Sequence, residues 1–181
     1  MKRDEFIKCT FGMCSCAAFA LWPQAAALAE SDNPEMDALK WKVDAGQKRF
    51  AKLVGILNDT LEEPTRKKVF ERLGRACAQD YRNLTDQYKG NVKGFLDLIQ
   101  QTWVEKAEYD EKAGTIRIVD KSRTCSCPLV QKGLTPSSFC DCTLGWQKET
   151  YSALLGKPVE AELEESLLRG GQKCVFRIRV V

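Results

Sequence analysis

The sequence predicts an α+β domain in which a layer of helices comes first and an antiparallel sheet with one inserted helix follows. Apolar residues recur at helical spacing through the first half of the chain beyond residue 33, and short stretches alternate with a period of two in the second half. Glycine and proline turns separate these stretches. A chain of 181 residues fits one domain and can bury a core without disulfides.

Three helices are expected before the sheet. The first covers about 34–59, where Leu39, Val43, Phe50, Leu53, Val54 and Leu57 follow helical spacing. The second opens at Pro64 and places on one face Val69, Phe70, Leu73, Ala76 and Cys77. The third covers about 92–101, with Phe95, Leu96 and Ile99 inward. Their polar faces carry both signs of charge, so we expect a packed helical layer and not a membrane-active one.

The sheet is expected from two hairpins. Residues 104–109 and 115–119 alternate across the turn EKAG, and residues 159–167 and 174–180 flank the turn Gly170-Gly171. A fourth helix over about 143–155 lies between them and ends at Gly156, with Pro158 beyond it. The sequence contains no repeat and no linker, so residues 30–181 are expected to form a single domain.

The first 29 residues have the features of a removable export signal. A charged opening, MKRDEFIK, precedes a short apolar stretch, and Ala27 and Ala29 provide the small residues expected before a cleavage at Glu30. The apolar stretch is too short for an ordinary membrane span. We therefore expect a periplasmic or extracellular protein with no membrane span after the signal is removed.

Charge and composition restrict the classes of function. The net charge is only +3, and basic and acidic residues are interleaved throughout, so we expect no nucleic-acid partner. The chain contains no histidine. Any metal ion must therefore be held by sulfur or carboxylate, and the usual general base of enzymes is missing.

Six of the nine cysteines follow the signal segment: Cys77, Cys125, Cys127, Cys140, Cys142 and Cys174. Four of them form two C-x-C pairs on either side of a twelve-residue loop. Such pairs suit a thiolate-bound metal ion if the backbone lets both sulfurs point to one place. Two disulfides across the loop are the alternative that an oxidising compartment favours, and redox-active or nucleophilic thiols are a third. Cys77, on an apolar helix face, is expected to be a core thiol.

The C-terminal third resembles a known family. From Cys140 to Ile178 the chain has a cysteine ahead of Gly145-Trp146, a helix ending in Gly156-Lys157-Pro158-Val159, an acidic strand, a glycine turn and Cys174-Val175-Phe176. The segment GRACA, 74–78, also fits. This order resembles the 4-vinyl reductase, or hydrocarbon-binding, domain family and the related L-2-amino-thiazoline-4-carboxylic acid hydrolase-like proteins.

The resemblance implies a pocket between helices and sheet for a small apolar or aromatic molecule, with zinc held nearby by cysteines and an acidic residue. It places Cys140 and Cys174 at two ligand positions, and Cys125, Cys127 and Cys142 are the further candidates. Residues that suit the pocket are Trp103, Trp146, Tyr151 and Phe176, although aromatic residues also build ordinary cores. The hydrolase-like relatives leave open a thiol-dependent enzyme, whose catalytic residues the sequence does not identify. A homodimer is compatible with this chain.

Overall fold

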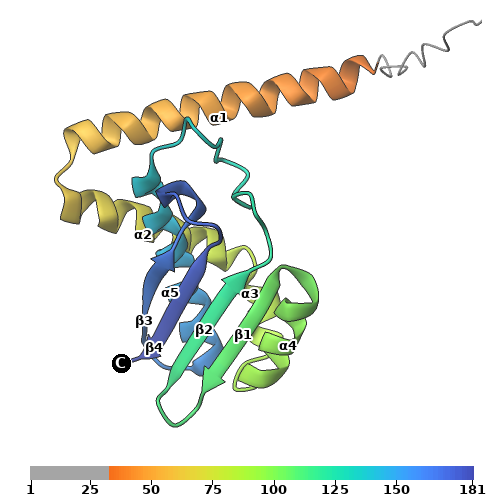
Figure 1. Ribbon diagram of the computed structural model, residues 1–181, viewed down its shortest axis with the longest axis vertical. Helices are drawn as coiled ribbons and strands as arrows, with labels where there is room; N and C mark the ends of the chain where they lie inside the picture. Colours follow the sequence, from red (N-terminus) through yellow and green to blue (C-terminus); the bar gives the residue numbers. More distant parts are fainter. Residues whose placement is uncertain (1–32) are drawn as a thin grey trace, which may run out of the picture. The chain divides into compact units, whose positions relative to one another are not determined.

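The computed structural model describes residues 33–181, and the predicted signal segment over 1–29 lies outside them. Residues 34–181 form one compact unit. Helices lead and a four-stranded antiparallel sheet follows, with one helix inserted between its two hairpins (Figure 1). The predicted α+β class is confirmed.

Five α-helices are present in this part of the chain, one more than the sequence predicts. The additional one is the short α3, which directly follows α2. The bounds are α1 Pro34–Thr60, α2 Glu63–Gln79, α3 Arg82–Gln87, α4 Val92–Thr102 and α5 Asp141–Leu155, and a 3-10 turn, η1 Ser137–Cys140, leads into α5. Helix α5 ends at Gly156, whose φ of 65° is the left-handed conformation that glycine adopts most easily.

The sheet has the strand order β1-β2-β4-β3, with all neighbours antiparallel. Its strands are β1 Val104–Asp110, β2 Thr115–Asp120, β3 Val159–Glu165 and β4 Val175–Val180. The second hairpin is therefore inserted so that β4 pairs with β2 at the centre and β3 forms an edge. A short 3-10 turn, η2 Leu167–Arg169, joins β3 to the glycine turn before β4.

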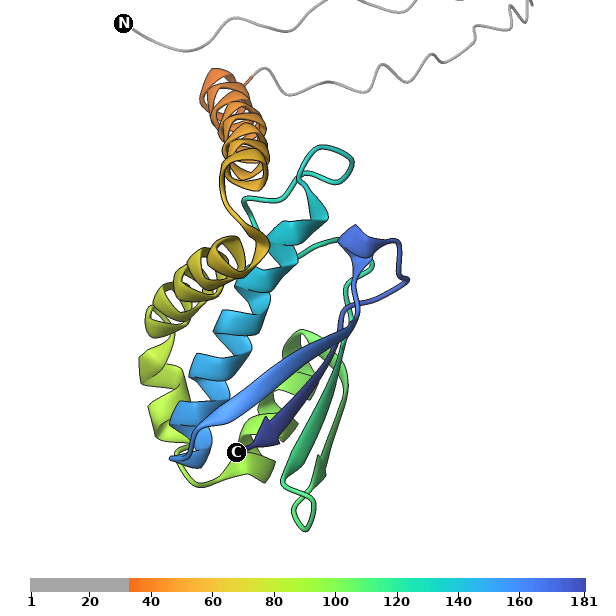
Figure 2. The ribbon, with the colours of Figure 1, turned by 90° about the vertical axis from the view of Figure 1, so that its left-hand side faces the viewer.

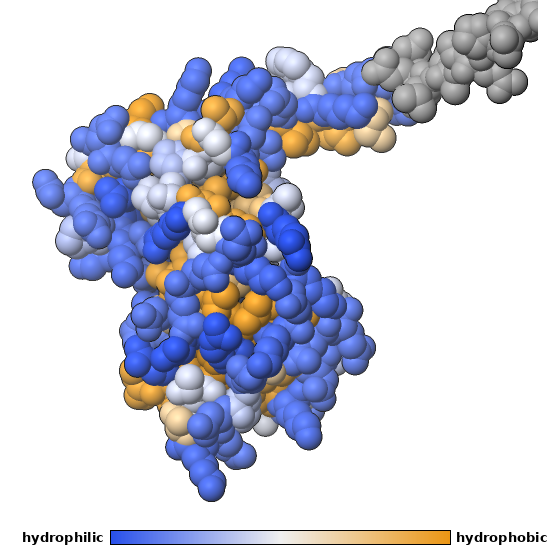
Figure 3. Space-filling model, in the orientation of Figure 1, coloured by the Kyte–Doolittle hydropathy of each residue, from blue (hydrophilic) through white to orange (hydrophobic). Residues whose placement is uncertain are grey.

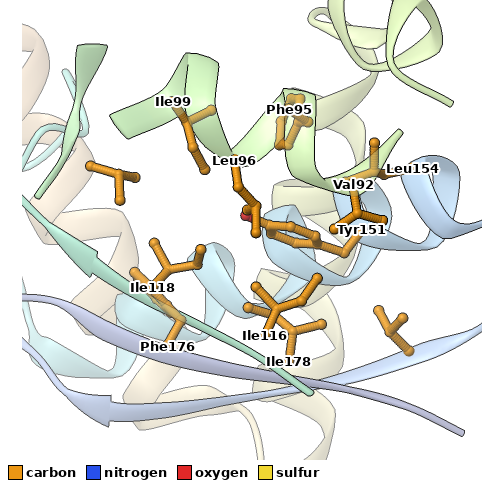
Figure 4. Close-up of a cluster of buried hydrophobic side chains, with 12 residues drawn as sticks. Val92, Phe95, Leu96, Ile99, Ile116, Ile118, Tyr151, Leu154, Phe176 and Ile178 are labelled. Atoms are coloured by element: carbon orange, nitrogen blue, oxygen red, sulfur yellow. The ribbon is translucent and has the colours of Figure 1, made fainter. Parts of the chain in front are cut away.

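The main core lies between one face of the sheet and the helices α4 and α5 (Figures 2 and 4). Helix α4 contributes the predicted inward residues, and alternate residues of β2 and β4 point at them. Leu154 of α5 and Val104 at the start of β1 are fully buried here. Burial of this apolar surface is the principal stabilising term of the fold.

The other sheet face carries charges that pair between strands. Glu164 of β3 forms ion pairs with Arg177 of β4 and with Arg117 of β2, the latter at 2.8 Å between Oε2 and Nε. Arg179 lies 3.5 Å from Glu162 in the same way. The carboxylates of the acidic strand β3 thus lie on this polar face and join three neighbouring strands.

Helices α2 and α5 touch backbone to backbone at two glycines. A Cβ atom on Gly74 would lie 1.7 Å from the carbonyl oxygen of Cys142, and one on Gly145 would lie 1.9 Å from that of Glu71. The buried stripe of α2 is accordingly Phe70, Gly74 and Ala78. The predicted face was wrong for Val69, Leu73 and Ala76, which are exposed, because the close approach centres the contact on Gly74.

The C-terminal half of α1 packs against a second, smaller apolar cluster. The ring centroids of Phe50 and Phe139 lie 4.7 Å apart, and Phe70 of α2 meets the same Phe139 ring. In the N-terminal half Leu39 and Val43, expected on the packed face, are 55% and 50% exposed, and apolar side chains line this half in Figure 3. Their helical periodicity was predicted correctly, but no element of the compact unit covers them. Within 33–181, none of the helices has both the length and the apolar character needed to cross a membrane.

Candidate functional site

The six cysteines of the described chain gather where the loop after β2 meets α2, α5 and the start of β4. All six are free thiols, and each is buried or half-buried. The loop runs from the end of β2 to α1 and returns to η1 (Figure 1). It is held to α1 by a 2.8 Å hydrogen bond that Gln47 donates to the carbonyl oxygen of Pro128. These separate segments of the chain thus bring their sulfurs into one region.

Three of the sulfurs form what we call the sheet-side group: Cys125, Cys140 and Cys174. Burial is the main reason why the pKa of each of these thiols is raised. The charge of Cys140 also raises the pKa of Cys125, that of Cys174 raises the pKa of Cys140, and that of Cys125 raises the pKa of Cys174. Each member therefore lies within electrostatic range of the other two.

The other three form the helix-side group: Cys77, Cys127 and Cys142. Burial raises the pKa of Cys127 and, most strongly, that of Cys142, to about 12. The charge of Cys77 adds to both shifts, and that of Cys127 adds to the shift of Cys142. Each C-x-C pair thus contributes one sulfur to each group. For Cys140 and Cys142 the reason is helical geometry, since residues two apart on a helical turn point in different directions.

Hydrogen bonds point at the sulfurs of both groups. The backbone N–H groups of Leu129 and Val130 bond to Cys127, that of Cys127 bonds to Cys125, and that of Leu167 bonds to Cys174. Each of these bonds acts to lower the pKa of the thiol that accepts it. Backbone N–H groups around a sulfur favour the thiolate form and orient it, as the surroundings of metal ligands do.

Cys140 is held by different partners. Its Sγ lies 3.1 Å from the hydroxyl oxygen of Ser166, a residue that is only 2% exposed. Arg169 lies close enough to lower the pKa of Cys140, although burial outweighs it and the net shift is upward. The same Arg169 guanidinium lies 3.1 Å from the carboxylate of Asp141. Cys140 therefore sits in a polar, structurally fixed position at the start of α5.

A carboxylate stands beside the sheet-side group. Asp120 ends β2, and its backbone N–H donates to the carbonyl oxygen of Cys174 at 3.0 Å. Burial raises the pKa of Asp120 to about 6, and its charge in turn raises the pKa values of Cys125 and Cys174. Asp120 therefore lies within electrostatic range of two sulfurs of the sheet-side group, between the loop and the sheet. This donor set is one that zinc accepts.

The donors do not yet form a closed coordination shell. Among residues 33–181, no three acidic or cysteine side chains already converge to hold an ion. Rotation of a cysteine side chain between staggered positions moves its sulfur by about 3 Å. The donor types fit zinc, because thiolate and carboxylate are both zinc ligands and no histidine is needed.

A charged cleft of about 500 Å³ opens beside Cys140, at the edge strand β3. Asp141, Leu144, Lys67 and Arg169 line it together with residues 160–163 and Arg179. The family resemblance implies a pocket for an apolar or aromatic molecule between the helices and the sheet, whereas this opening is lined mostly by charged residues. Its charges pair with one another across the rim, as Asp141 does with Arg169.

The four predicted pocket residues do not meet in one place. Tyr151 and Phe176 lie in the main core, each 2% exposed (Figure 4). Trp103 is 49% exposed at the end of α4, and Trp146 packs against Tyr81 with ring centroids 5.0 Å apart. Only Tyr151 and Phe176 therefore belong to one apolar cluster, which α4, α5 and the sheet enclose.

The sequence analysis did not predict two residues of the candidate site, Cys77 and Asp120. Cys77, expected to be a core thiol, is half-buried on α2, and its charge raises the pKa of both Cys127 and Cys142. Asp120 ends a strand and has no motif around it. In the sequence, the even count of six cysteines was the only indication that Cys77 joins the other thiols. For Asp120 the only indication was its position five residues before Cys125.

Comparisons with known proteins support the fold but name no family. No family model and no curated protein matches the chain. The phenol-responsive sensory domain of the transcription activator PoxR, solved with phenol, is 16% identical over 74% of each chain, with a TM-score of 0.50. A trafficking protein particle complex subunit 3 from Naegleria fowleri, covalently bound to palmitic acid, is 13% identical over 76% of this chain and 96% of that one.

The two likenesses differ in weight. At 16% identity the first shows the fold alone, and at a TM-score of 0.48 the second supports no conclusion. The resemblance to the 4-vinyl reductase family therefore stays a prediction.

Proposed function

We propose that this protein is an exported small-molecule-binding domain in which a zinc ion ties the loop after β2 to the sheet. The observation that supports the proposal is the electrostatic proximity of Cys125, Cys140 and Cys174 to one another, with the carboxylate of Asp120 in range of Cys125 and Cys174. Of the five cysteines that the sequence predicts as ligands, Cys125, Cys140 and Cys174 belong to this zinc site. The chemistry that the ion supplies is structural, because it links segments that lie far apart in the sequence.

Each ligand is positioned by the surrounding structure. Asp120 and Cys174 are fixed to one another by the backbone hydrogen bond between β2 and the start of β4. Cys140 is fixed by Ser166, and Cys125 accepts a backbone N–H from Cys127. Burial keeps the thiols protonated without metal, so binding of zinc releases protons and depends on pH.

The small molecule is proposed to be apolar or aromatic. Support comes from the fold, which the chain shares with a phenol-responsive sensory domain. Tyr151 and Phe176 supply aromatic surface within an apolar cluster that helices and sheet enclose. Small-molecule sites are usually lined by such residues, with few polar groups.

Hydrolysis by a thiolate has less support. A nucleophilic cysteine normally has a lowered pKa and an adjacent base. Burial instead raises the pKa of Cys140, despite Arg169 and Ser166, and the chain has no histidine. The hydrolase alternative would gain support from rapid alkylation of a single cysteine that abolishes a measured turnover.

A native mass spectrum of the protein purified from the medium or periplasm tests the proposal. We expect a chain that begins at Glu30 and carries zinc, and we expect Cys174→Ser to lose one zinc. Cys77→Ser is the matched control, because Cys77 lies outside the sheet-side group. An intact mass with three disulfides, or a chain that is unprocessed and retained in the cytoplasm, would contradict the corresponding part of the proposal.

The ligand is tested with phenol as the probe. We expect phenol to raise the melting temperature of the zinc-loaded protein, and we expect Tyr151→Leu to reduce that increase. Trp103→Leu serves as the control, since Trp103 lies at the surface away from the apolar cluster. Equal responses of the two variants would show that phenol does not enter at Tyr151.

A further inference from the structure

The apolar stripe of helix α1 continues past the part of the helix that packs on the domain. In the C-terminal half, Phe50 and Leu57 pack against the smaller apolar cluster, and Val54 is fully buried. Leu39 and Val43 precede Phe50 by eleven and seven residues and lie on the same face of the helix, yet they are 55% and 50% exposed. Among residues 33–181, no element covers this part of the stripe, whose apolar side chains are visible in Figure 3.

The spacing of the stripe is the heptad spacing of coiled coils. Its members follow one another at alternating distances of three and four residues: Met36, Leu39, Val43, Gly46, Phe50, Leu53 and Leu57. A narrow stripe with this spacing packs against another helix, because each side chain fits between side chains of the facing helix. We call its uncovered part, from Met36 to Gly46, the α1 seam.

The chain that precedes α1 does not supply the facing helix. The proposed cleavage before Glu30 leaves residues 30–32 ahead of the described chain. Three extended residues span about 10 Å and are too few for a turn of helix. The partner of the α1 seam therefore comes from another molecule, and this step rests on the proposed export.

A second copy of the chain offers a matching helix in the antiparallel orientation. If two α1 seams cross centred on residue 41, Leu39 of each copy lies opposite Val43 of the other. Met36 of each copy then lies opposite Gly46 of the other. Nothing lies within 4 Å of a Cβ atom added at Gly46, so there is room for the longer side chain.

Coverage by the domain and charge both bear on the orientation. A parallel pair would continue the contact through Phe50 and Leu57, which the chain's own domain covers. In the antiparallel pair, Glu35 of each copy lies on the same flank of the contact as Arg49 of the other, and the opposite charges attract. Lys42 meets its counterpart near the two-fold axis and opposes association.

We propose that the α1 seams of two copies of this chain pair antiparallel and form a symmetric dimer. Each copy contributes the same residues, as in other two-fold contacts between identical subunits. The α1 seam is about 15 Å long, which is short for a subunit interface. We therefore expect a dimer that dissociates on dilution.

Sedimentation equilibrium of the protein purified from the medium or periplasm tests the inference, and the intact mass reports where the chain begins. We expect a monomer–dimer equilibrium in which Leu39→Asp raises the Kd at least about tenfold. Ile56→Asp is the matched control and should leave the Kd unchanged, since Ile56 is 60% exposed on another face of the same helix. Circular dichroism checks that both variants are folded.

An exchange of charges tests the antiparallel register. Arg49→Glu is expected to raise the Kd about tenfold, because it places two carboxylates side by side at both ends of the contact. Adding Glu35→Arg should restore the wild-type Kd to within about threefold. Residues 35 and 49 lie about 21 Å apart along one helix, so the restoration arises between copies. Lys42→Gln should lower the Kd.

Each contrary result has a distinct meaning. A chain that begins at Glu30 and stays monomeric at a concentration on the order of 0.5 mM would overturn the inference and leave the proposed export and zinc site intact. A dimer that Leu39→Asp leaves unchanged would use another surface, and failure of the charge exchange to restore the Kd would refute the antiparallel register. A monomer that retains residues 1–29 would contradict both the export and the inference.

Discussion

Replacement of a crossing glycine by alanine should destabilise this protein, although the same change usually stabilises a helix. Alanine in a helix interior is favoured over glycine by about 0.5–1 kcal/mol. At Gly145, however, the new Cβ would lie 1.9 Å from the carbonyl oxygen of Glu71, and at Gly74 it would lie 1.7 Å from that of Cys142. The facing atoms are backbone, so the helices must separate, and such overpacking costs about 1–3 kcal/mol.

The matched control is Gly46→Ala in α1, where nothing lies within 4 Å of the added Cβ. Urea unfolding of metal-free protein, followed by circular dichroism, should give Gly145→Ala a free energy of unfolding about 1–3 kcal/mol below wild type. Gly46→Ala should lie about 0.5–1 kcal/mol above it. If Gly145→Ala were as stable as Gly46→Ala, the close approach of α2 and α5 would be refuted.

Three further predictions concern the sheet, the core and the thiols. Burial opposes ionisation of Glu164, but hydrogen bonds from Arg117 and Arg177 outweigh it and lower the pKa of this carboxylate from its ordinary value of 4.5. The ionised carboxylate therefore stabilises the folded state above the ordinary pKa, and this stabilisation is lost as the pH falls through the lowered pKa. Glu164→Gln should therefore cost roughly 1 kcal/mol in urea unfolding at pH 7 and almost nothing at pH 3; equal costs would contradict the ion pairs. Leu154→Ala, at a fully buried position, should lower the free energy of unfolding by about 2–5 kcal/mol, and a loss below about 1 kcal/mol would mean that α5 does not pack as described. With a pKa of about 12, Cys142 of the metal-free protein should react more slowly with iodoacetamide at pH 8 than a cysteine of the urea-unfolded chain, and peptide mapping that finds equal rates would be the contrary result.

Local patterns predicted most of the secondary structure. The alternation in β2 and β4 and the spacing in α4 report which face is buried, because each of these elements covers one side of a single core. The same reasoning failed for α2. The buried face of α2 is set by Gly74, whose backbone touches α5. A hydrophobicity pattern cannot indicate such a contact, because glycine has no side chain that would add to the pattern.

The thiol site stays a prediction. The C-x-C pairs indicate that sulfur is concentrated in one loop, and the charges of Cys125, Cys140 and Cys174 raise one another's pKa values. Spacing along the chain did not indicate that each pair is divided between two groups. That division depends on Cys77 and Asp120, which approach from other elements.

The sequence by itself determined the order of helices and strands, the polar face of the sheet and the number of thiols. These follow from local periodicity and composition, which act over a few residues. Only the tertiary structure decided which thiols face one another, because their proximity results from the contact of α2 with α5 and the pairing of β2 with β4. Such contacts join residues that lie far apart in the chain, and the packing of the whole domain sets them.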